Sequence, residues 1–334
     1  MDITVILCTY NRSESLTNTL ESLSASVLPE SVGWEVLVVD NNSTDQTRQV
    51  VEDFCSRHPK HFRYLFEPKP GKSHALNTGV SNAHGEILAF TDDDVTVEPS
   101  WLRNLTAPLG VPGWAGIGGR TLPASSFSPP SWLPLGGPQD MGGILALFDR
   151  GDSPGELDKP PYGVNMAYPR RMFEEYGAFR EDLGPSPNKD IPRPNEDTEF
   201  GRRLLAGGER LRYEPSAVVY HPVPENRLRK KYFLDWWFDY GRALIREKGN
   251  KPDVLGVPRY LISIPKMVTT YLSVRTVQWL WDFDAQERFY RKCVVWKIAG
   301  EIVETHRQGR RRSAERNAMT EKPGREPKSR HLEQ

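Results

Sequence analysis

Three consecutive aspartates, Asp92, Asp93 and Asp94, follow the apolar run ILAFT, which is typical of a buried strand. A strand that ends in clustered carboxylates presents them together at one edge of a sheet. Carboxylate oxygens are the ligands that Mg²⁺ and Mn²⁺ prefer, and both ions readily share their coordination with the phosphates of a substrate. The triplet therefore predicts a divalent-metal site. The alternative is a solvated acidic turn in which one aspartate caps a helix.

Another acid stands at the end of a second apolar run. Asp40 closes the run Val36–Val39 and opens the sequence DNNSTD. An aspartate at such a strand end can accept hydrogen bonds from a ribose hydroxyl or from a base N–H. Asp-Asn-Asn-Ser is also a common turn sequence, so a turn remains the alternative for Asp40.

The sequence GKSHALNTG, which starts at Gly71, contains a candidate phosphate-binding lysine. The complete phosphate-loop pattern needs an upstream glycine, and Phe66 occupies that place. We expect the sequence to open a helix instead. Lys72, near the positive end of the helix dipole, could then approach a diphosphate. The alternative is an ordinary exposed lysine.

Two adjacent acids, Glu196 and Asp197, precede an amphipathic pattern, and we expect a helix to begin near Thr198. Acids at a helix start often serve only as caps or as partners of the helix dipole. A functional carboxylate here would act as a general base that takes a proton from an attacking hydroxyl.

His221 directly follows the strand-like run Leu211–Tyr220. A histidine at an exposed strand end is well placed to bind a metal ion. A single histidine is more often structural, however, so this position alone leaves both interpretations open.

The alternation of apolar runs explains how these groups could meet. In the first hundred residues, strand patterns alternate with helix patterns, which predicts a parallel sheet with right-handed crossovers and helices on both faces. Ligands bind such sheets at the carboxyl ends of the strands, where the polar residues above are found. The expected strands are Ile3–Cys8, Val36–Val39, Phe62–Phe66 and Ile87–Phe90. The expected helices are Ser13–Leu23 capped by Ser13 or Ser15, a helix with Val50, Val51 and Phe54 capped by Ser43 or Thr44, and Lys72–Ala83.

The second half of the chain is less regular. Residues 121–161 are rich in Pro, Gly and Ser, which indicates an irregular excursion rather than a regular strand–helix unit. We expect strands at Gly163–Tyr168 and Leu211–Tyr220, followed by helices to about His306. The basic tail that follows, residues 307–334, has few apolar residues and is predicted to be disordered.

Composition sets limits on the function. The 44 Lys and Arg residues balance the 44 Asp and Glu residues, so the net charge argues neither for nor against a polyanionic partner. We expect no nucleic-acid partner. Cys8, Cys55 and Cys293 form no CxxC pair, which argues against a disulfide framework or a thiolate zinc site and favours a reducing, cytoplasmic location. The N-terminus is typical of a strand rather than a signal peptide, and no apolar run reaches the roughly 20 residues of a spanning helix.

Six motifs, in their order and spacing, resemble the family 2 glycosyltransferases of GT-A fold: TYNR, VVDNNSTD, GKSHALNTG, FTDDD, GVNMAYPRRMFEEYGAF and NEDTEF. The resemblance covers roughly residues 3–221. It implies an α/β fold with a mixed, mainly parallel sheet flanked by helices and a helical C-terminal extension. The implied domains are a glycosyltransferase domain at 1–225 (nucleotide-binding half about 1–120, acceptor half about 121–225), a helical region at 226–306 and the tail at 307–334.

The resemblance also implies a role for each candidate residue. By position, Asp197 is the catalytic base, Asp94 is the principal protein ligand of Mg²⁺ or Mn²⁺, and His221 matches a metal ligand that only some members use. The remaining positions imply that Thr9, Tyr10 and Arg12 line the nucleotide pocket, Asp40 binds base or ribose, Lys72 lies near the nucleotide, Asp92 and Asp93 contact ribose or donor sugar, and Glu196 binds acceptor or donor sugar.

The implied reaction is transfer of a sugar from a nucleotide-sugar donor to the hydroxyl of a glycan or lipid-linked acceptor, with inversion of the anomeric centre. A UDP-sugar is the default donor, with dTDP- and GDP-sugars as alternatives. Processive members carry a QxxRW motif, which Gln278-Trp279 does not complete, so single addition is expected.

Two other functions stay open. A sugar-phosphate nucleotidyltransferase would need a Gly-rich loop where TYNRSES stands, and a non-catalytic nucleotide-sugar binding protein would need the pocket without the base.

Aromatic and basic residues dominate the region between 228 and 300. This composition suits a membrane interface, because aromatic rings prefer the headgroup level and basic side chains attract anionic lipids. The hypothesis is peripheral attachment to the cytoplasmic face of the inner membrane, where a lipid-linked acceptor would be found. The alternative is packing of C-terminal helices against the sheet.

Overall fold

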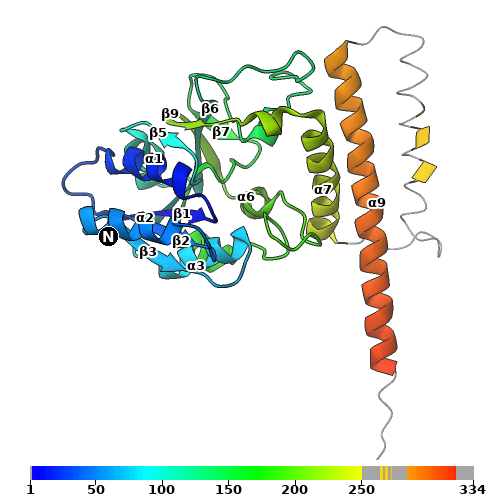
Figure 1. The fold of residues 1–334 in the computed structure, drawn as a ribbon, viewed down its shortest axis with the longest axis horizontal. Coiled ribbons are helices and arrows are strands. Elements are labelled where there is room, and N and C mark those ends of the chain that lie inside the picture. Colours follow the sequence, from blue (N-terminus) through cyan, green and yellow to red (C-terminus); the bar gives the residue numbers. More distant parts are fainter. Residues whose placement is uncertain (1, 250–263, 266–267, 270–271, 273–283, 321–334) are drawn as a thin grey trace, which may run out of the picture.

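The protein is an α/β structure built on one mixed nine-stranded sheet, with two long C-terminal helices beside it (Figure 1). The computed structural model describes residues 2–249, 264–265, 268–269, 272 and 284–320. The strand order is β3-β2-β1-β4-β8-β6-β9-β5, and β7 pairs with β9 beside this path. The expectation of a mixed sheet flanked by helices is confirmed.

The first four strands form the parallel half of the sheet, in the order β3-β2-β1-β4. They are β1 (Ile3–Thr9), β2 (Trp34–Asp40), β3 (Phe62–Phe66) and β4 (Ile87–Thr91). The register pairs Thr9 with Asp40, so the carboxyl ends of β1 and β2 are level. All four expected strands are therefore confirmed within one or two residues.

The apolar runs of these strands are continuous because both faces of the sheet are covered by helices. On β1, Val5 and Leu7 pack with α1 (Ser13–Ser24) and α2 (Thr47–Arg57). Ile6, between them, packs on the other face with α3 (Lys72–Asn82). The helix α4 (Trp101–Thr106) joins the first face, and α5 (Arg170–Tyr176) and α6 (Glu196–Ala206) join the second.

The predicted helix caps, Ser13 or Ser15 for the first helix and Ser43 or Thr44 for the second, are wrong. Helix α1 starts after Arg12, with Ser13 already helical, and α2 starts only at Thr47. One side chain serves both helices: the Asp45 carboxylate accepts the N–H of Ser13 at 3.1 Å and that of Thr47 at 3.0 Å. A sequence pattern cannot show that a single acid reaches two helix starts.

The other strands are β5 (Thr96–Val97), β6 (Gly116–Pro123), β7 (Gly155–Leu157), β8 (Asn165–Pro169) and β9 (Leu211–His221). Strand β8 runs antiparallel to both β4 and β6, and β6 runs parallel to β9. The excursion after β6 is irregular, as expected, except for a short 3₁₀ helix, η2 (Gly142–Leu145), and β7. Two further 3₁₀ turns are η1 (Ala107–Gly110) and η3 (Glu225–Leu228).

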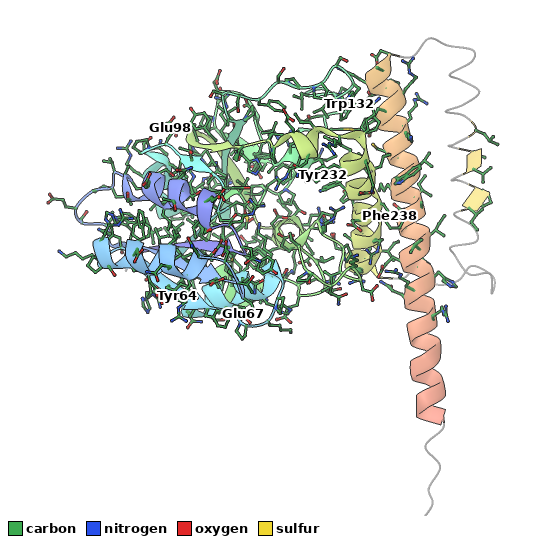
Figure 2. All side chains as sticks on the ribbon, in the orientation of Figure 1. Tyr64, Glu67, Glu98, Trp132, Tyr232 and Phe238 are labelled. Atoms are coloured by element: carbon green, nitrogen blue, oxygen red, sulfur yellow. The ribbon has the colours of Figure 1, made fainter. Side chains whose placement is uncertain are left out.

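The C-terminal helices α7 (Lys230–Lys248) and α9 (Ala285–Thr320) lie side by side against one end of the sheet domain (Figure 1). Figure 2 places Trp132 beside them, and its ring lies 5.3 Å from Phe233 of α7 and 4.7 Å from Phe289 of α9. This contact joins the excursion after β6 to both helices.

Helix α9 continues past His306 to Thr320, so the predicted disorder is wrong for residues 307–320. The rest of the predicted tail, 321–334, and the dipeptide Gln278-Trp279 lie outside the described residues. Among the described helices, none combines the length and the apolar character that crossing a bilayer requires.

The Asn165 side chain forms hydrogen bonds at an irregular point of the sheet. Strands β6 and β9 change register between Gly119 and Arg120. The buried Asn165 amide donates to the carbonyl oxygens of Arg120 and Ala217, each at 2.9 Å. Its oxygen accepts the indole N–H of Trp101 at 2.9 Å. One side chain thus satisfies two carbonyl groups at the irregular pairing and the indole N–H of Trp101 on α4.

Asn165→Ala is expected to lower the free energy of unfolding by about 2–4 kcal/mol, because it strands three buried polar groups at once. Urea denaturation measures the loss. The exposed Asn82 of α3, replaced by Ala, is the control and should change stability by only about 0.5 kcal/mol. Equal effects of the two substitutions would contradict this role of Asn165.

Candidate active site

A cavity of about 520 Å³ opens at the carboxyl edge of the sheet, where polar residues were predicted to gather. We call it the triplet cavity, after Asp92–Asp94 in its wall. Eight of the predicted residues line it: Thr9, Tyr10, Arg12, Lys72, Asp92, Asp93, Asp94 and His221. Fold topology therefore brings together residues from the ends of β1, β4 and β9 and from the start of α3.

Three of these residues form a group that could hold a metal ion. Asp92, Asp94 and His221 each offer one ligand atom, and the three atoms lie within 4.8 Å of one another. Two carboxylates suit Mg²⁺ or Mn²⁺, and the buried imidazole has a ring nitrogen, Nδ1, with no hydrogen-bond partner. Burial lowers the pKa of His221, which keeps the ring in the neutral form that binds metals. The donor set therefore fits a divalent cation.

Two cationic side chains form ion pairs with the aspartates of the triplet. The Arg12 guanidinium donates to Asp94 and lies 3.7 Å from Asp93, and the Lys72 ammonium donates to Asp92 at 2.7 Å. Burial would by itself raise the pKa of Asp92, but the Lys72 charge outweighs it and the pKa is lowered. Burial raises the pKa of Asp93 to about 7. The cavity thus offers positive groups to a diphosphate beside carboxylates for a metal ion.

A second cavity, of about 610 Å³, surrounds Asp197, and we call it the Asp197 cavity. Asp197 stands in the first turn of α6, where one carboxylate oxygen accepts the N–H of Gly163 at 2.6 Å. The two cavities share Lys72, Asp92 and Pro185 in their walls. Asp197 therefore lies across this shared wall from Asp93 and Asp94, and Asp92 is part of the wall.

Comparison with known proteins decides the family. The model of the family described as "Glycosyl transferase family 2" matches residues 4–177. The chain is also 31% identical over 254 residues to the succinoglycan biosynthesis protein ExoM of Rhizobium meliloti (strain 1021), covering 75% of this chain and 77% of that protein. The chain belongs to glycosyltransferase family 2.

One further relative agrees with this family, and one solved structure agrees with the fold. The glucosyl-dolichyl phosphate glucuronosyltransferase of Haloferax volcanii is 26% identical over 251 residues, which cover 73% of this chain and 77% of that protein. The mannosyltransferase PcManGT from Pyrobaculum calidifontis, solved with GDP-Man and Mn²⁺, superposes with a TM-score of 0.61 at 20% identity, over 90% of this chain and 86% of that one. The fold is GT-A, and the nucleotidyltransferase alternative is not favoured.

Asp40 lies apart from the other predicted residues of this glycosyltransferase. Its buried carboxylate accepts the N–H of Ser43 at 2.9 Å and the hydroxyl of Tyr64 at 3.0 Å, and it lines neither cavity. The neighbouring Asn41 lines the triplet cavity in its place. The contacts of Asp40 are those of the turn that was its alternative, and its role in base or ribose binding stays a prediction.

Several lining residues of the family 2 enzyme were not singled out from the sequence. Arg227, on η3, adds a cation to the triplet cavity. Trp236, Trp237 and Tyr240 of α7 line the Asp197 cavity. These three belong to the aromatic and basic region whose composition suggested a membrane interface or core packing. Tyr240 follows Trp237 by three residues and Trp236 by four, and this one-turn spacing was the available signal for a shared aromatic surface.

Glu196 of the glycosyltransferase is a buried acid beside Lys72, with 3.8 Å between the carboxylate and the ammonium. Burial, followed by the charge of Asp197, raises the pKa of Glu196 above its ordinary value of 4.5. Above pH 4.5 the folded state therefore binds more protons than the unfolded state, and this group's contribution to stability is lost as pH rises.

Glu196→Gln should accordingly make stability fall less between about pH 5 and pH 8, because glutamine does not titrate. Urea denaturation of the metal-free protein at both pH values measures the change. Glu174→Gln, at an exposed position of α5, controls for general loss of a carboxylate. An unchanged pH dependence in Glu196→Gln would show that Glu196 is ionised in the folded protein throughout this range.

Proposed function

We propose that this glycosyltransferase moves a sugar from a nucleoside-diphosphate sugar to an acceptor hydroxyl, with inversion of the anomeric centre. One observation carries the proposal: the triplet cavity and the Asp197 cavity share Lys72 and Asp92. A donor in the first cavity would present its sugar at this shared wall. An acceptor in the second would meet that sugar beside Asp197.

The charges of the triplet cavity support a diphosphate donor. Arg12, Lys72 and Arg227 line it, and each carries a positive charge that a diphosphate can pair with. Asp92, Asp94 and His221 would hold Mg²⁺ or Mn²⁺, which supplies Lewis-acid neutralisation of the departing nucleoside diphosphate. A UDP-sugar is the default donor from the resemblance, with dTDP- and GDP-sugars as alternatives.

Asp197 is the proposed base. The acceptor O–H proton moves to its carboxylate while the acceptor oxygen bonds to the anomeric carbon and the bond from that carbon to the diphosphate oxygen breaks. The Gly163 N–H fixes one carboxylate oxygen at 2.6 Å, which orients the base without protonating it. Base and leaving group then act on opposite faces of the sugar, as in inverting glycoside hydrolysis, so a single displacement inverts the centre.

The Asp197 cavity suits a saccharide acceptor. Trp236 and Tyr240 stack with ring centres 5.2 Å apart, and with Trp237 they form one wall of the cavity. Aromatic faces attract the C–H groups on the apolar side of a sugar ring, because the face of the ring carries partial negative charge. We therefore propose a glycan or a lipid-linked sugar as acceptor. One relative is named for a dolichyl phosphate-linked substrate.

Peripheral attachment to the cytoplasmic face of the membrane is a further part of the proposal. It is supported by the basic run Arg310, Arg311 and Arg312 near the C-terminus, which would favour anionic lipids. The aromatic residues of α7 contribute less than expected, since Trp236 and Trp237 line a cavity and Phe233 is fully buried. In a flotation assay with anionic vesicles, protein that stays entirely in the soluble fraction would refute attachment.

A donor screen tests the proposed reaction. UDP-, GDP- and dTDP-sugars are incubated with the protein, Mn²⁺ and mixed oligosaccharides, and the released nucleotide is identified. We expect nucleoside diphosphate from one donor class and loss of activity with EDTA. Release of pyrophosphate instead would indicate nucleotidyl transfer.

Asp197→Asn should reduce kcat by on the order of 10²–10⁴-fold while sparing donor affinity, because the amide keeps the size of the side chain but cannot take a proton. Turnover and calorimetric binding of the donor measure the two effects. Glu199→Gln is the matched control: it removes a carboxylate from the same helical turn at a residue that lines neither cavity. Full activity in Asp197→Asn would reject the base assignment.

Trp236→Ala should raise the KM for a saccharide acceptor by about tenfold or more without changing donor affinity, because it removes part of the aromatic wall. Initial rates at varied acceptor concentration measure this effect. The control is Trp114→Ala, since Trp114 is half-buried against Arg210 and lines neither cavity. An unchanged acceptor KM in Trp236→Ala would place the acceptor elsewhere.

A further inference from the structure

Residues 182–194 form an irregular stretch that touches both cavities, and we call it the bridging segment. Pro185, Ser186 and Pro187 line the triplet cavity, while Arg193 and Pro194 line the Asp197 cavity. The segment leads directly into α6, which carries Asp197. Its conformation therefore affects the donor wall, the acceptor wall and the placement of the base.

The inner side of the bridging segment is tied to α3. The Lys72 N–H donates to the carbonyl of Pro185 at 2.8 Å, and the Ser73 hydroxyl donates to the carbonyl of Leu183 at 2.7 Å. These contacts link the segment to the helix that supplies the Lys72 ammonium. Movement of the segment would move one wall of the triplet cavity relative to that ammonium.

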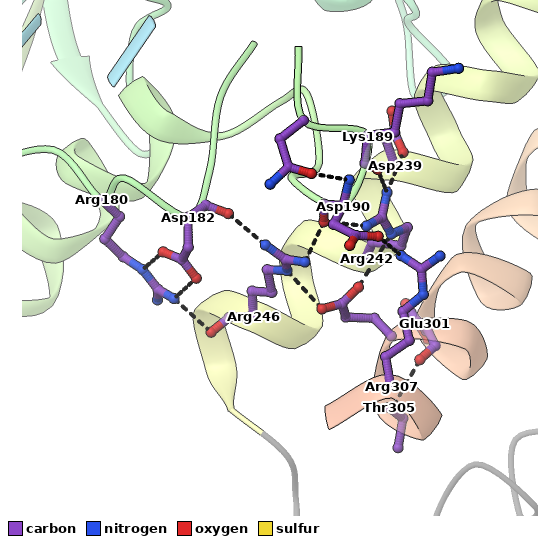
Figure 3. A network of polar contacts seen from close by, with 12 residues as sticks. Arg180, Asp182, Lys189, Asp190, Asp239, Arg242, Arg246, Glu301, Thr305 and Arg307 are labelled. Carbon is purple, nitrogen blue, oxygen red and sulfur yellow. Dashed lines mark hydrogen bonds and ion pairs between the residues drawn. The ribbon is translucent and has the colours of Figure 1, made fainter. Parts of the chain in front are cut away.

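The outer side is held by two arginines of α7 (Figure 3). The Arg246 guanidinium donates to the carbonyl of Asp182 at 3.0 Å and also to that of Asp190. The Arg242 guanidinium donates to the carbonyl of Lys189 at 3.3 Å and shares the Asp190 carbonyl. These bonds go to backbone oxygens on both sides of residues 185–187, so they fix the path of the chain there.

Glu304 of α9 organises both arginines. It is only 1% exposed, and its two oxygens accept the Nε–H groups of Arg246 at 2.7 Å and Arg242 at 3.2 Å. Because the carboxylate occupies the Nε side of each guanidinium, the terminal nitrogens are left to reach the bridging segment. It also neutralises part of the positive charge that two adjacent guanidiniums bring into a buried place.

Close helix packing fixes the position of Glu304. A Cβ atom added at Gly241 of α7 would lie 2.0 Å from the carbonyl oxygen of Lys297, and one added at Gly300 of α9 would lie 2.0 Å from that of Phe238. The two backbones are therefore in direct contact, one turn away from Glu304. Residues 178–334, which contain all of these groups, lie outside the match to the family model.

We propose that Glu304 is a positioning residue for donor binding: through Arg242 and Arg246 it holds the bridging segment in the shape that completes the triplet cavity. The C-terminal helix is then part of the active-site architecture, although none of its described side chains lines either cavity. The inference rests on the proposed function only in assigning the donor to the triplet cavity.

Glu304→Gln tests the proposal, because glutamine keeps the size of the side chain but cannot accept from both arginines with charged oxygens. Hydrogen exchange of the free protein should speed up in residues 182–194. Binding of UDP, GDP and dTDP with Mn²⁺, measured by calorimetry, should weaken for the nucleotide that the wild type binds, by on the order of 10- to 100-fold. The donor KM should rise in parallel, which mere loss of folded enzyme would not cause.

Glu35→Gln is the matched control. Glu35 is also buried, bridges Thr4 and Arg63, and lies near the amino end of β2, at the opposite edge of the sheet from the cavities. This substitution should lower the free energy of unfolding. It should leave nucleotide affinity and hydrogen exchange of the bridging segment unchanged.

Unchanged exchange in 182–194 together with unchanged nucleotide affinity in Glu304→Gln would overturn the proposal. If the wild type binds none of the three nucleotides, the proposed function fails, and the exchange measurement alone decides whether Glu304 holds the segment. If Glu304→Gln does not fold, Arg246→Lys replaces it, since lysine keeps the charge but cannot contact Glu304, Asp182 and Asp190 together. For Arg246→Lys, faster exchange in 182–194 with weaker nucleotide binding would support the proposal, and no change in either would overturn it.

Discussion

The Lys72 ammonium joins the two halves of the active site. It donates to Asp92 at 2.7 Å and lies 3.8 Å from Glu196. Burial alone would lower the pKa of Lys72, but the charge of Asp92, followed by that of Glu196, outweighs it and raises the pKa above its ordinary value, so the group stays charged. Asp92 follows a strand of the parallel half and Glu196 starts α6 in the second half. One half-buried cation therefore lies at the boundary that the two cavities share.

Sheet topology explains why the metal-binding candidates meet. Strand β4 runs antiparallel to β8, β8 antiparallel to β6, and β6 parallel to β9. Strand β9 therefore runs in the same direction as β4, and its carboxyl end reaches the same edge of the sheet. His221 ends β9 there, with its Nε2 3.7 Å from Asp94. The irregular excursion between β6 and β8 reverses the direction of the chain. Strand β9 then runs parallel to β6 again, which brings His221 to this edge of the sheet.

Local signals predicted the parts of the site that end strands. The apolar runs before Thr9 and Asp92 predicted that these residues share one sheet edge, because the direction of a parallel strand fixes where its end lies. For His221 the sequence predicted only an exposed strand end. Strand direction could not show which of Asp40 and its neighbour Asn41 lines the cavity. Both follow β2, but the Asp40 carboxylate bonds to Ser43 and Tyr64, contacts that only the folded chain reveals.

Features that depend on how the helices pack together could not be predicted from the sequence. The aromatic residues of α7 have a composition that a membrane surface and a cavity wall would equally explain, and only the position of α7 beside Asp197 distinguishes them. Likewise, the contact of Gly241 and Gly300 with the facing helix requires knowing that α7 and α9 pack together. Long-range packing, rather than local pattern, determines these parts of the site.

A structure of the protein with Mn²⁺ and a non-hydrolysable nucleoside-diphosphate sugar tests the two-cavity account most directly. The account places the diphosphate between Arg12 and Lys72, and the anomeric carbon at the wall shared by the two cavities, with Asp197 on the face opposite the leaving group. A donor sugar that points away from the Asp197 cavity, or that presents its leaving group to Asp197, would contradict it.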